Sequence, residues 1–363
     1  MKKFTKILSL ALCLLMTLSL LLSCNSKKEE TNNNNTDSDT LAQTLEGDFY
    51  DEKGLYYVSL DASKKTCEVS VGRATDVKKI EIPATYNGYT VTNIAQAGFA
   101  NCEKLESITI PASVEVIEDL AFQNSTNLAE IKLANNAKLK KIGYGVFKNT
   151  AYYANEKQGD TFYFGKYFIE ADKTVTSCEI KDGTKFISGY AFSNCTALTT
   201  VTIPASVKYI DSFAFNNCKA LKRVNISDLK AWCSIEFADH SVNPLSMIAI
   251  ASKDNVNGLY LNGSLVTVLN ISSNITTISD YAFYGYKGLA EIHFSTAIKT
   301  IGNGAFGDLN LNSLIVTETD DKTGESYQVQ YYKVFFAGNQ NDWKNVKKTG
   351  AGLPGNDHID FAK

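Results

Sequence analysis

The sequence contains few histidines and prolines and no cluster of basic residues. Only three of its 363 residues are histidine (His240, His293 and His358), which leaves little for acid–base or zinc chemistry. Five prolines argue against a proline-rich or collagen-like chain. Lys and Arg number 36 against 39 Asp and Glu, for a formal net charge of −3, and no basic block offers the surface that nucleic-acid binding requires. The composition therefore disfavours nucleic-acid binding and metalloenzyme chemistry, and we expect no metal or cofactor.

The N-terminus has the layout of a secretory signal peptide over residues 1–23. Three lysines within the first six residues precede Ile7–Leu22, a run of sixteen residues without a charge. This run is short for a membrane span, which needs about 20 residues. Residues 25–40 contain no large apolar side chain, so we expect residues 24–40 to form a disordered tether between the membrane and a folded body.

The signal peptide ends in Leu21-Leu22-Ser23-Cys24, which resembles the bacterial lipobox. In that motif a small residue precedes the cysteine whose sulfur receives a lipid. The resemblance implies lipidation of Cys24 and a membrane partner held through that lipid. The alternative is an ordinary leader in which the cysteine is incidental.

A repeat of about 23 residues fills most of the remaining chain. The segment Leu105–Asn127 recurs as Leu198–Ala220, and an Ile followed five residues later by Phe occurs in seven copies. The Ile positions are 94, 117, 142, 187, 210, 278 and 301, and the Phe positions are 99, 122, 147, 192, 215, 283 and 306. Two longer Phe spacings, 45 and 68 residues, are close to two and three periods, which predicts that the number of coils is kept there.

Each copy supplies apolar side chains to two faces of one coil. Val201 and Ile203 alternate as on a short strand, which Pro204 ends because it lacks a donor. Ile210 and Phe215 must then turn inward along the returning half, which we expect to be non-strand. One coil cannot enclose these side chains, whereas stacked coils bury them in a continuous core. The pattern predicts a β-rich solenoid of short parallel strands about 4.8 Å apart.

The repeat resembles the leucine-rich repeat, specifically the bacterial BspA-like subclass with its consensus TIP-x-SV…I…AF…C. The resemblance covers roughly Lys79–Val316, and the block at Ala231-Trp232-Cys233 is also family-like. It implies a leucine-rich repeat array that is secreted or surface-anchored, non-catalytic, and often linked with adhesion to host matrix proteins or other cells. The chain departs from the consensus where a Cys is usual, at Ser125, Thr150, Tyr286 and Leu309.

The repeats are interrupted twice. Near 151–177, two apolar runs flank Gly165-Lys166, a hairpin candidate, and near 228–264, Asn262-Gly263 is a strong hairpin signal. End coils need covers because their cores are otherwise exposed. We expect an N-terminal cap at 41–78, the solenoid at 79–316 and a C-terminal cap at 317–363.

Four of the eight cysteines occupy core positions of the repeat. They are Cys102, Cys178, Cys195 and Cys218. Cys195 and Cys218 lie one coil apart, which brings a disulfide within reach, but parallel in-register side chains match the disulfide dihedral poorly. We therefore expect buried free thiols at these positions. The states of Cys67 and Cys233, outside clear repeats, are left open.

Catalytic chemistry has a single candidate pair, Cys233 and His240. A cysteine hydrolase needs a Cys with a nearby His and an orienting group, and Asp239 lies in the same block. No Gly-rich turn surrounds Cys233, and the block resembles a structural insert of the family. We expect no catalytic residue, with a Cys233/His240 hydrolase as the remaining enzymatic alternative.

The leading hypothesis is a lipid-anchored, non-catalytic module for binding or adhesion. Its partner would be a protein or a glycan, on host matrix or on another cell surface. The alternative is a structural envelope spacer without a specific ligand. The outward slots of the sheet offer candidate contacts that are polar, of mixed charge and free of aromatic residues; they include Glu130, Lys132, Arg223 and His293.

Anchoring contacts are expected from the first insert. Interface hot spots favour aromatic residues, and loops on a rigid scaffold often carry function, so Tyr152 and Tyr153 are the predicted anchors. The insert also contains Phe162, Phe164 and Phe168. We interpret these three residues as filling the gap left by an irregular coil.

Overall fold

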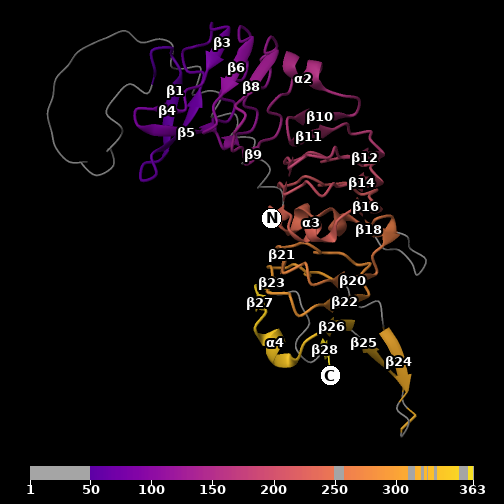
Figure 1. Cartoon of the computed structure of the whole chain (residues 1–363). Coiled ribbons are helices and arrows are strands. Elements are labelled where there is room, and N and C mark those ends of the chain that lie inside the picture. Colours follow the sequence, from indigo (N-terminus) through magenta and orange to yellow (C-terminus); the bar gives the residue numbers. More distant parts are fainter. Residues whose placement is uncertain are drawn as a thin grey trace, which may run out of the picture. The chain divides into compact units, whose positions relative to one another are not determined.

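Short strands from successive repeats lie side by side in parallel and build a solenoid (Figure 1). The computed structural model describes residues 50–248, 257–309, 315–319, 323–324, 326–330, 333–350 and 359–362. All of them belong to one unit, Phe49–Lys363. A regular coil contributes a strand of three or four residues from the first half of the repeat and a two-residue strand from the second half. The expected β-rich leucine-rich repeat solenoid is confirmed.

The first-half strands stack with the same apolar position in register. Cys178 of β12 is paired with Val201 of β14, and Val201 with Val224 of β16, and all three side chains are buried. The register is fixed because a slip of one residue would turn this apolar row to solvent. The strands of this kind are β3 (Lys79–Glu81), β6 (Ser107–Ile110), β8 (Glu130–Leu133), β12 (Ser177–Glu179), β14 (Thr200–Thr202), β16 (Arg223–Ile226), β18 (Gly258–Leu261), β20 (Val268–Ile271), β22 (Glu291–Phe294), β26 (Lys333–Phe336) and β28 (Ile359–Phe361).

The returning halves also form strands, so the expectation that they are non-strand is wrong. Extended backbone is needed only for the repeat Ile and its predecessor before the chain turns, so most of these strands have two residues. Ile187 of β13 is paired with Ile210 of β15, and both are fully buried. The set comprises β5 (Tyr89–Ile94), β7 (Val116–Ile117), β9 (Lys141–Ile142), β11 (Tyr167–Ala171), β13 (Phe186–Ile187), β15 (Tyr209–Ile210), β17 (Glu236–Phe237), β21 (Thr277–Ile278), β23 (Thr300–Ile301) and β27 (Lys347–Lys348).

The repeat Phe residues stack on one another inside the solenoid. The ring centroids of Phe192 and Phe215 are 4.9 Å apart and those of Phe283 and Phe306 are 5.3 Å apart, both pairs nearly parallel. All seven repeat Ile and all seven repeat Phe side chains are at most 3% exposed, which confirms the predicted register. At about 1.5–3 kcal/mol per buried large side chain, this column is the main favourable term of each coil.

Each regular coil turns at a corner, defined as the five residues that end two positions after the repeat Phe, usually at an Asn. In the corner 120–124, Leu120 and Asn124 have φ of 61° and 60°, a left-handed conformation that Asn adopts more readily than other side chains. Three N–H groups of this corner donate to the next corner: Leu120 to Tyr144 O (2.8 Å), Phe122 to Val146 O (3.0 Å) and Asn124 to Lys148 O (2.9 Å). Corners that begin at Ala97, Tyr190 and Tyr281 make the same three bonds.

The corner asparagines form a ladder that the sequence analysis missed. The side-chain amide of Asn124 donates to Asn101 Oδ1 at 3.1 Å, and that of Asn217 donates to Asn194 Oδ1 at 2.8 Å. All four residues have positive φ. The ladder therefore both fits the left-handed turn and links neighbouring coils.

The two long gaps in the repeat differ. In the 45-residue gap, Phe168 of β11 is paired with Ile187 and fully buried, so that one extra coil makes two periods as predicted. In the 68-residue gap, Phe237 of β17 is paired with Ile210, and the described residues between Phe237 and Ile278 contain no second such strand. Two first-half strands, β16 and β18, still lie between β14 and β20, as three periods require. On the returning side, the described part of the chain instead folds into short helices that pack on the next corner.

Those helices are α3 (Leu229–Cys233), η1 (His240–Val242) and η2 (Pro244–Met247). The indole N–H of buried Trp232 donates to Ala282 O at 2.9 Å, and the side-chain amide of buried Asn243 donates to Tyr281 O at 2.7 Å. Side chains thus supply donors to the corner that begins at Tyr281, where a regular coil would use backbone N–H groups.

Both predicted hairpins are present. β10 (Thr161–Phe164) pairs with β11 in antiparallel fashion around Gly165-Lys166, and β18 pairs with β19 (Ser264–Leu265) around Asn262-Gly263. Before the first hairpin, Thr150 caps the short helix α2 (Ala151–Glu156) by accepting from the Tyr153 N–H at 3.1 Å.

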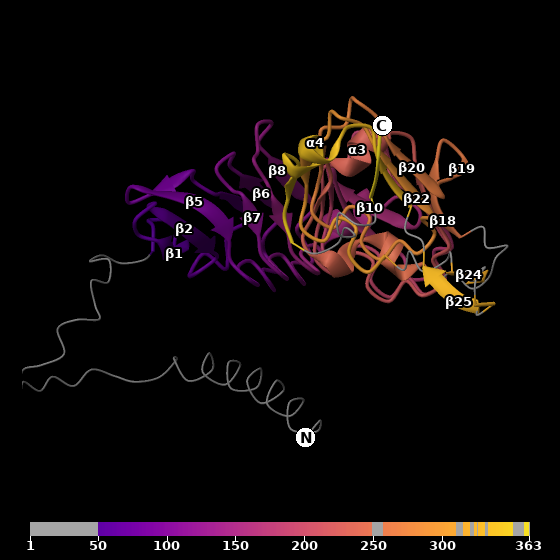
Figure 2. The same ribbon diagram turned by 90° about the horizontal axis from the view of Figure 1, so that it is seen from below.

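Near the N-terminal end, β1 (Tyr56–Asp61) and β2 (Thr66–Ser70) form a hairpin whose β2 pairs with β5, and β4 (Thr85–Tyr86) also pairs with β5. Beyond residue 316, β26 and β28 extend the first-half sheet, with α4 (Gln340–Lys344) between them. The hairpin of β24 (Ile315–Thr319) and β25 (Ser326–Gln330) precedes them (Figure 2). None of the helices in the described ranges is long and apolar enough to cross a membrane.

Candidate functional site

The predicted lipid site, Cys24, lies outside the described residues, as do the signal peptide 1–23 and the tether 24–40. Lipidation therefore stays a prediction. The other predicted contact residues lie in described coils, and their surroundings differ.

The strand-face candidates are engaged with their own neighbours. Glu130 and Lys132 on β8 are both exposed and form an ion pair of 3.1 Å with each other. On β16, the Arg223 guanidinium lies 3.7 Å from the ring centre of Tyr260 and donates to Asn225 Oδ1 at 2.7 Å. These contacts satisfy the charges locally, so this face offers few unsatisfied groups to a partner.

His293 lies on the outward face of β22, as its place in the strand predicts. Its Nε2 is 3.1 Å from Glu291 Oε2, and its ring stacks on Phe335 with centroids 4.5 Å apart. Lys333 donates to the other oxygen of Glu291 at 3.0 Å. The lowered pKa of Glu291 results first from the Lys333 hydrogen bond and then from that of His293.

The structure does not bring the strand-face candidates together. Glu130 and Lys132 belong to the sheet β3-β6-β8, Arg223 to the sheet that contains β16, and His293 to the sheet that contains β22. The predicted contact positions are themselves free of aromatics, but the neighbouring strands place Tyr260 and Phe335 opposite Asn225 and His293. Both come from irregular coils whose register the sequence repeat does not fix.

Tyr152 and Tyr153, the predicted anchors, are half-buried against the core. The Tyr152 ring centre is 5.9 Å from that of Phe147, and the Tyr153 ring centre is 4.7 Å from that of Phe162. Burial raises the pKa of Tyr152 to about 12. The neighbouring Phe162, Phe164 and Phe168 are at most 2% exposed, which confirms that they fill the irregular coil.

An exposed row of aromatic rings escaped the sequence analysis. Tyr144, Tyr190 and Phe213 are 50%, 37% and 45% exposed, among the few large apolar side chains so exposed in the described residues. The centroids of Tyr144 and Tyr190 are 5.3 Å apart in an edge-to-face contact, and those of Tyr190 and Phe213 are 5.0 Å apart and stacked. We call these three residues the aromatic row.

The signal for the aromatic row was present in the repeat. Tyr190 and Phe213 each stand three residues after a repeat Ile, and both have left-handed backbone, with φ of 62° and 60°. Tyr144 stands one position earlier because Gly145 takes the left-handed place. A bulky aromatic residue at a strained, outward-facing turn position is unusual and indicates a surface role.

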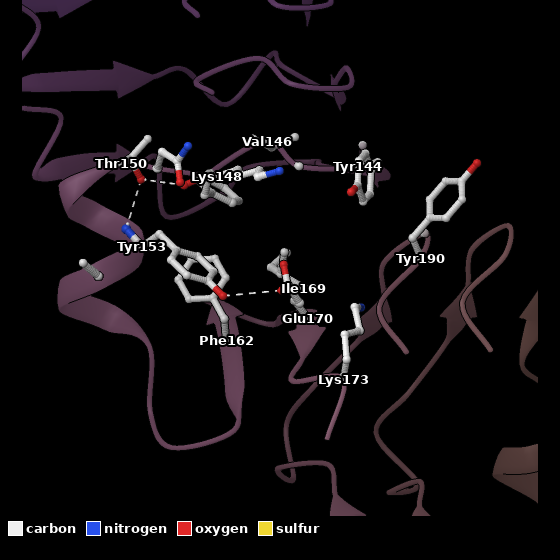
Figure 3. A pocket seen from close by; sticks show the side chains of 16 residues that line it. Tyr144, Val146, Lys148, Thr150, Tyr153, Phe162, Ile169, Glu170, Lys173 and Tyr190 are labelled. Carbon is white, nitrogen blue, oxygen red and sulfur yellow. Dashed lines mark hydrogen bonds between the residues drawn. The ribbon is translucent and has the colours of Figure 1, made fainter. Parts of the chain in front are cut away.

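A cavity of about 450 Å³ opens beside the aromatic row (Figure 3). Tyr144 and Tyr190 lie on one side of it, with Tyr153 and Phe162 on the other. Its volume falls in the range of small-ligand sites, which are lined mainly by apolar and aromatic side chains with a few polar groups. The charged side chains at its border are Lys148, Glu170 and Lys173.

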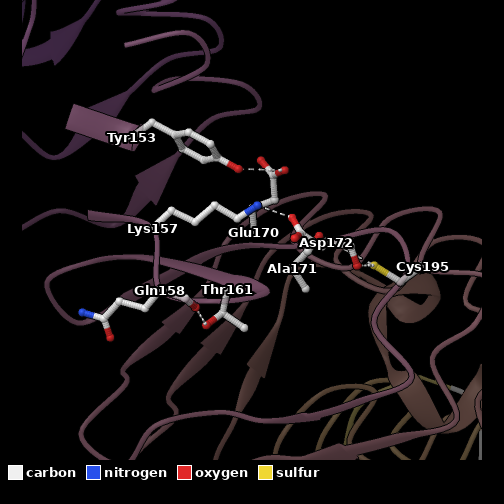
Figure 4. Close-up of polar contacts among 8 residues, drawn as sticks. All are labelled: Tyr153, Lys157, Gln158, Thr161, Glu170, Ala171, Asp172 and Cys195. Carbon is white, nitrogen blue, oxygen red and sulfur yellow. Dashed lines mark hydrogen bonds and ion pairs between the residues drawn. The ribbon is translucent and has the colours of Figure 1, made fainter. Parts of the chain in front are cut away.

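Polar contacts surround two of the residues that line this cavity, Tyr153 and Glu170 (Figure 4). The hydroxyl of Tyr153 donates to Glu170 Oε1 at 3.5 Å, and Lys157 forms an ion pair with Asp172. The thiol of Cys195 reaches the carbonyl of Asp172 at 3.5 Å. These bonds connect α2 to the strand β11 and to the next regular coil.

The enzymatic alternative is not supported by its surroundings. Cys233 is fully buried, and desolvation raises the pKa of its thiol to about 12, so the nucleophilic thiolate is disfavoured. His240 is exposed, and its ring lies against Tyr284 at 5.0 Å. The region that the structure describes also contains no group of three or more His, Cys, Asp or Glu that could hold a metal ion.

All six described cysteines are free and buried. The prediction of buried free thiols at Cys102, Cys178, Cys195 and Cys218 is confirmed. Cys67 and Cys233, left open by the sequence, share this state. Burial raises the pKa of Cys218 to about 12, and the Sγ atom of Cys218 contacts Phe192 O at 3.1 Å.

Among solved structures, the chain is similar to several bacterial leucine-rich repeat proteins. The T. pallidum leucine-rich repeat protein TpLRR shares 20% identity, with 72% of this chain and 89% of that chain covered and a TM-score of 0.29. A leucine-rich cell surface protein of Faecalibacterium prausnitzii shares 19%, with 84% and 98% covered and a TM-score of 0.31. A leucine-rich repeat protein of Bacteroides ovatus shares 19%, with 85% and 88% covered and a TM-score of 0.26. A comparison with curated proteins finds no match.

A family model described as the BspA type leucine-rich repeat region, with six copies, matches residues 43–168, 163–261 and 257–333. These matches span the coils with the stacked Phe column, both inserts and the aromatic row. The chain belongs to the BspA-type leucine-rich repeat family.

Proposed function

We propose that this protein is a lipid-anchored, non-catalytic module at the cell surface that binds a protein or glycan partner. The observation that carries the proposal is the aromatic row. Exposed, contiguous aromatic side chains on a monomer favour a binding surface, because Tyr and Trp supply large rigid contact area at low entropic cost. Tyr144, Tyr190 and Phe213 are held by a rigid stack, so little ordering is required on binding.

The anchor rests on Leu21-Leu22-Ser23-Cys24 and on membership of the BspA-type family. A lipid on Cys24 would place the folded unit outside the membrane, with residues 24–40 as its tether. Cys24→Ala should move the full chain from the detergent phase to the aqueous phase and abolish incorporation of radiolabelled palmitate. Unchanged palmitate incorporation in this variant would remove the anchor from the proposal.

The second candidate function is that of a structural spacer, which is favoured by the paired charges on the strand face. Pairs such as Glu130–Lys132 and His293–Glu291 satisfy each other and leave little for a partner. In this case the solenoid has no specific ligand. Catalysis forms no part of either proposal, since burial of Cys233 separates its thiol from solvent.

Adhesion of the immobilised full chain to host-matrix and bacterial-surface fractions separates these candidates. The triple variant Tyr144→Ser/Tyr190→Ser/Phe213→Ser should lose most of the binding of the wild type. Two matched variants, Glu130→Ala/Lys132→Ala and Tyr152→Ala/Tyr153→Ala, test the strand face and the first insert.

If the strand-face variant abolishes binding while the triple variant binds normally, the site lies on the sheet and the aromatic row is not involved. If Tyr152→Ala/Tyr153→Ala alone abolishes it, the first insert is the site. Failure of the wild type to bind any fraction favours the spacer.

A further inference from the structure

The bonds between corners are broken at the first insert. In four regular junctions, three corner N–H groups donate to the next corner. The corresponding donors of the corner 145–149 are the N–H groups of Gly145, Phe147 and Asn149, and none of them has a hydrogen bond within the described residues. The hairpin coil that follows has a shortened corner and supplies a single bond, from Ala171 N–H to Ala191 O at 2.9 Å.

Gly145, Phe147 and Asn149, whose N–H groups lack acceptors, are all among the residues that line the cavity of Figure 3. Phe147 is only 2% exposed, and a buried backbone N–H without an acceptor is rare in proteins. A row of parallel N–H donors is also a recognised way of binding an anion. The corner before the second insert lacks the same bonds at Phe213, Phe215 and Asn217, so broken junctions occur at both inserts.

At the first insert, positively charged side chains lie at the cavity in addition to the free N–H groups. Lys148 and Lys173 at the cavity border are both exposed, and neither has an ion pair in the described part of the chain. Glu170 is the one acidic side chain among the described lining residues, and the neighbouring Asp172 is neutralised by Lys157. Among the lining residues themselves, two positive and one negative side chain give a net charge of +1, which complements an anion.

The mouth of the cavity has a different character. The rings of Tyr144 and Tyr190 are exposed there, and an aromatic ring suits the apolar C–H face of a pyranose. Glu170 and the hydroxyl of Tyr153 can exchange hydrogen bonds with sugar hydroxyl groups, since they already bond to each other at 3.5 Å. In a sugar that carries a carboxylate, the carboxylate would bind the N–H groups and the ammonium groups, and the sugar ring would pack on the tyrosine rings.

We propose that this cavity binds a carboxylate-bearing sugar unit, of the uronic or sialic acid class, within a glycan. The inference deepens the proposed function, on which it rests, by naming the chemistry of the partner. An acidic peptide would satisfy the ammonium groups but would make less use of the tyrosine faces, so it is the competing outcome.

Calorimetric titration of the full chain in detergent tests the inference with four probes. They are methyl glucuronide, N-acetylneuraminic acid, methyl glucoside and a hexaglutamate peptide. We expect at least one of the acidic sugars to bind, and methyl glucoside to bind about tenfold more weakly than methyl glucuronide or not at all, the loss expected for a charge-assisted hydrogen bond. Equal binding of glucoside and glucuronide, tighter binding of the peptide, or no binding of either acidic sugar overturns the inference.

Variants then locate the site. Lys148→Ala/Lys173→Ala should weaken the acidic sugar about tenfold, whereas Lys104→Ala/Lys219→Ala, an equal change of charge at exposed lysines outside the cavity, should not. Glu170→Gln should tighten binding, which guards against a result caused only by misfolding. Equal effects of the two lysine pairs, or weaker binding by Glu170→Gln, contradict the assignment. If the wild type adheres to a surface fraction and acidic sugars neither bind nor compete, the sugar inference fails while the binding function stands.

Discussion

The regular coils of this solenoid differ from the coils next to the two inserts in how the repeat Phe rings pack and in whether the corner N–H groups are bonded. In the regular pair around Phe192 and Phe215, rings stack at 4.9 Å and three corner bonds close the junction. At the first insert, Phe147 meets Phe162 edge-on at 5.5 Å and the three corner bonds are absent. The comparison indicates that repetition provides stability, whereas departures from repetition leave donors, cavities and exposed rings available for binding.

The largest loss of stability should come from truncating a Phe side chain in the stacked column of repeat Phe residues. Phe215→Ala should lower the free energy of unfolding by about 3–5 kcal/mol, because it leaves a cavity beside the Phe192 ring. Phe213→Ala, two residues away but 45% exposed, should change it little. Denaturant unfolding monitored by circular dichroism measures both. Similar losses for the two variants would mean that the corner, rather than the column, stabilises the coil.

A smaller effect is expected at the corner asparagines. Asn194 has φ of 63° and accepts a hydrogen bond from Asn217, so Asn194→Ala should cost about 1–2 kcal/mol. Asn194→Gly keeps the backbone freedom and should cost less. Asn216→Ala, at an adjacent exposed position without positive φ, is the control. Equal stability of the Ala and Gly variants would exclude the left-handed turn as the cause.

The stability of the regular coils should depend on pH through Asp211, whose side chain is only 7% exposed. Burial raises its pKa, although the Ser212 N–H at 2.7 Å acts in the opposite direction. A carboxyl whose pKa is higher in the folded state favours folding most below its unfolded pKa, and this contribution is lost as the pH rises through the folded value. Asp211→Asn should therefore raise the Tm at pH 7 and have less effect near pH 3. The control Asp280→Asn, at an exposed position, should leave the Tm unchanged. A lower Tm of Asp211→Asn at pH 7 would contradict the prediction.

Thiol labelling should show no difference between the two kinds of coil. Cys218 in a regular coil and Cys233 in the second insert are both fully buried, and burial raises the pKa of each to about 12. Iodoacetamide near pH 8 should label neither in the native chain and both after unfolding, as measured by mass spectrometry. Selective native labelling of Cys233 would revive the enzymatic alternative.

The sequence predicts the regular coils well because every coil repeats the same physical requirement. Ile210 and Phe215 must be buried wherever coils stack, so periodicity alone gives their register. The inserts obey no period: Phe237 occupies an Ile position after a 27-residue step, and Tyr260 and Phe335 reach the strand face through coils of irregular length. The cavity could not be predicted, because it depends on which corner bonds are left unmade.

Hydrogen exchange of corner amides measured by NMR tests the central comparison most directly. Phe122 and Phe147 are both repeat Phe residues and both are buried, yet only the Phe122 N–H has an acceptor, Val146 O at 3.0 Å. The amides of Leu120, Phe122 and Asn124 should be protected, and those of Gly145, Phe147 and Asn149 should exchange much faster through the cavity. Equal protection of the two sets would contradict the account, because it would mean that the junction at the first insert is closed like the others.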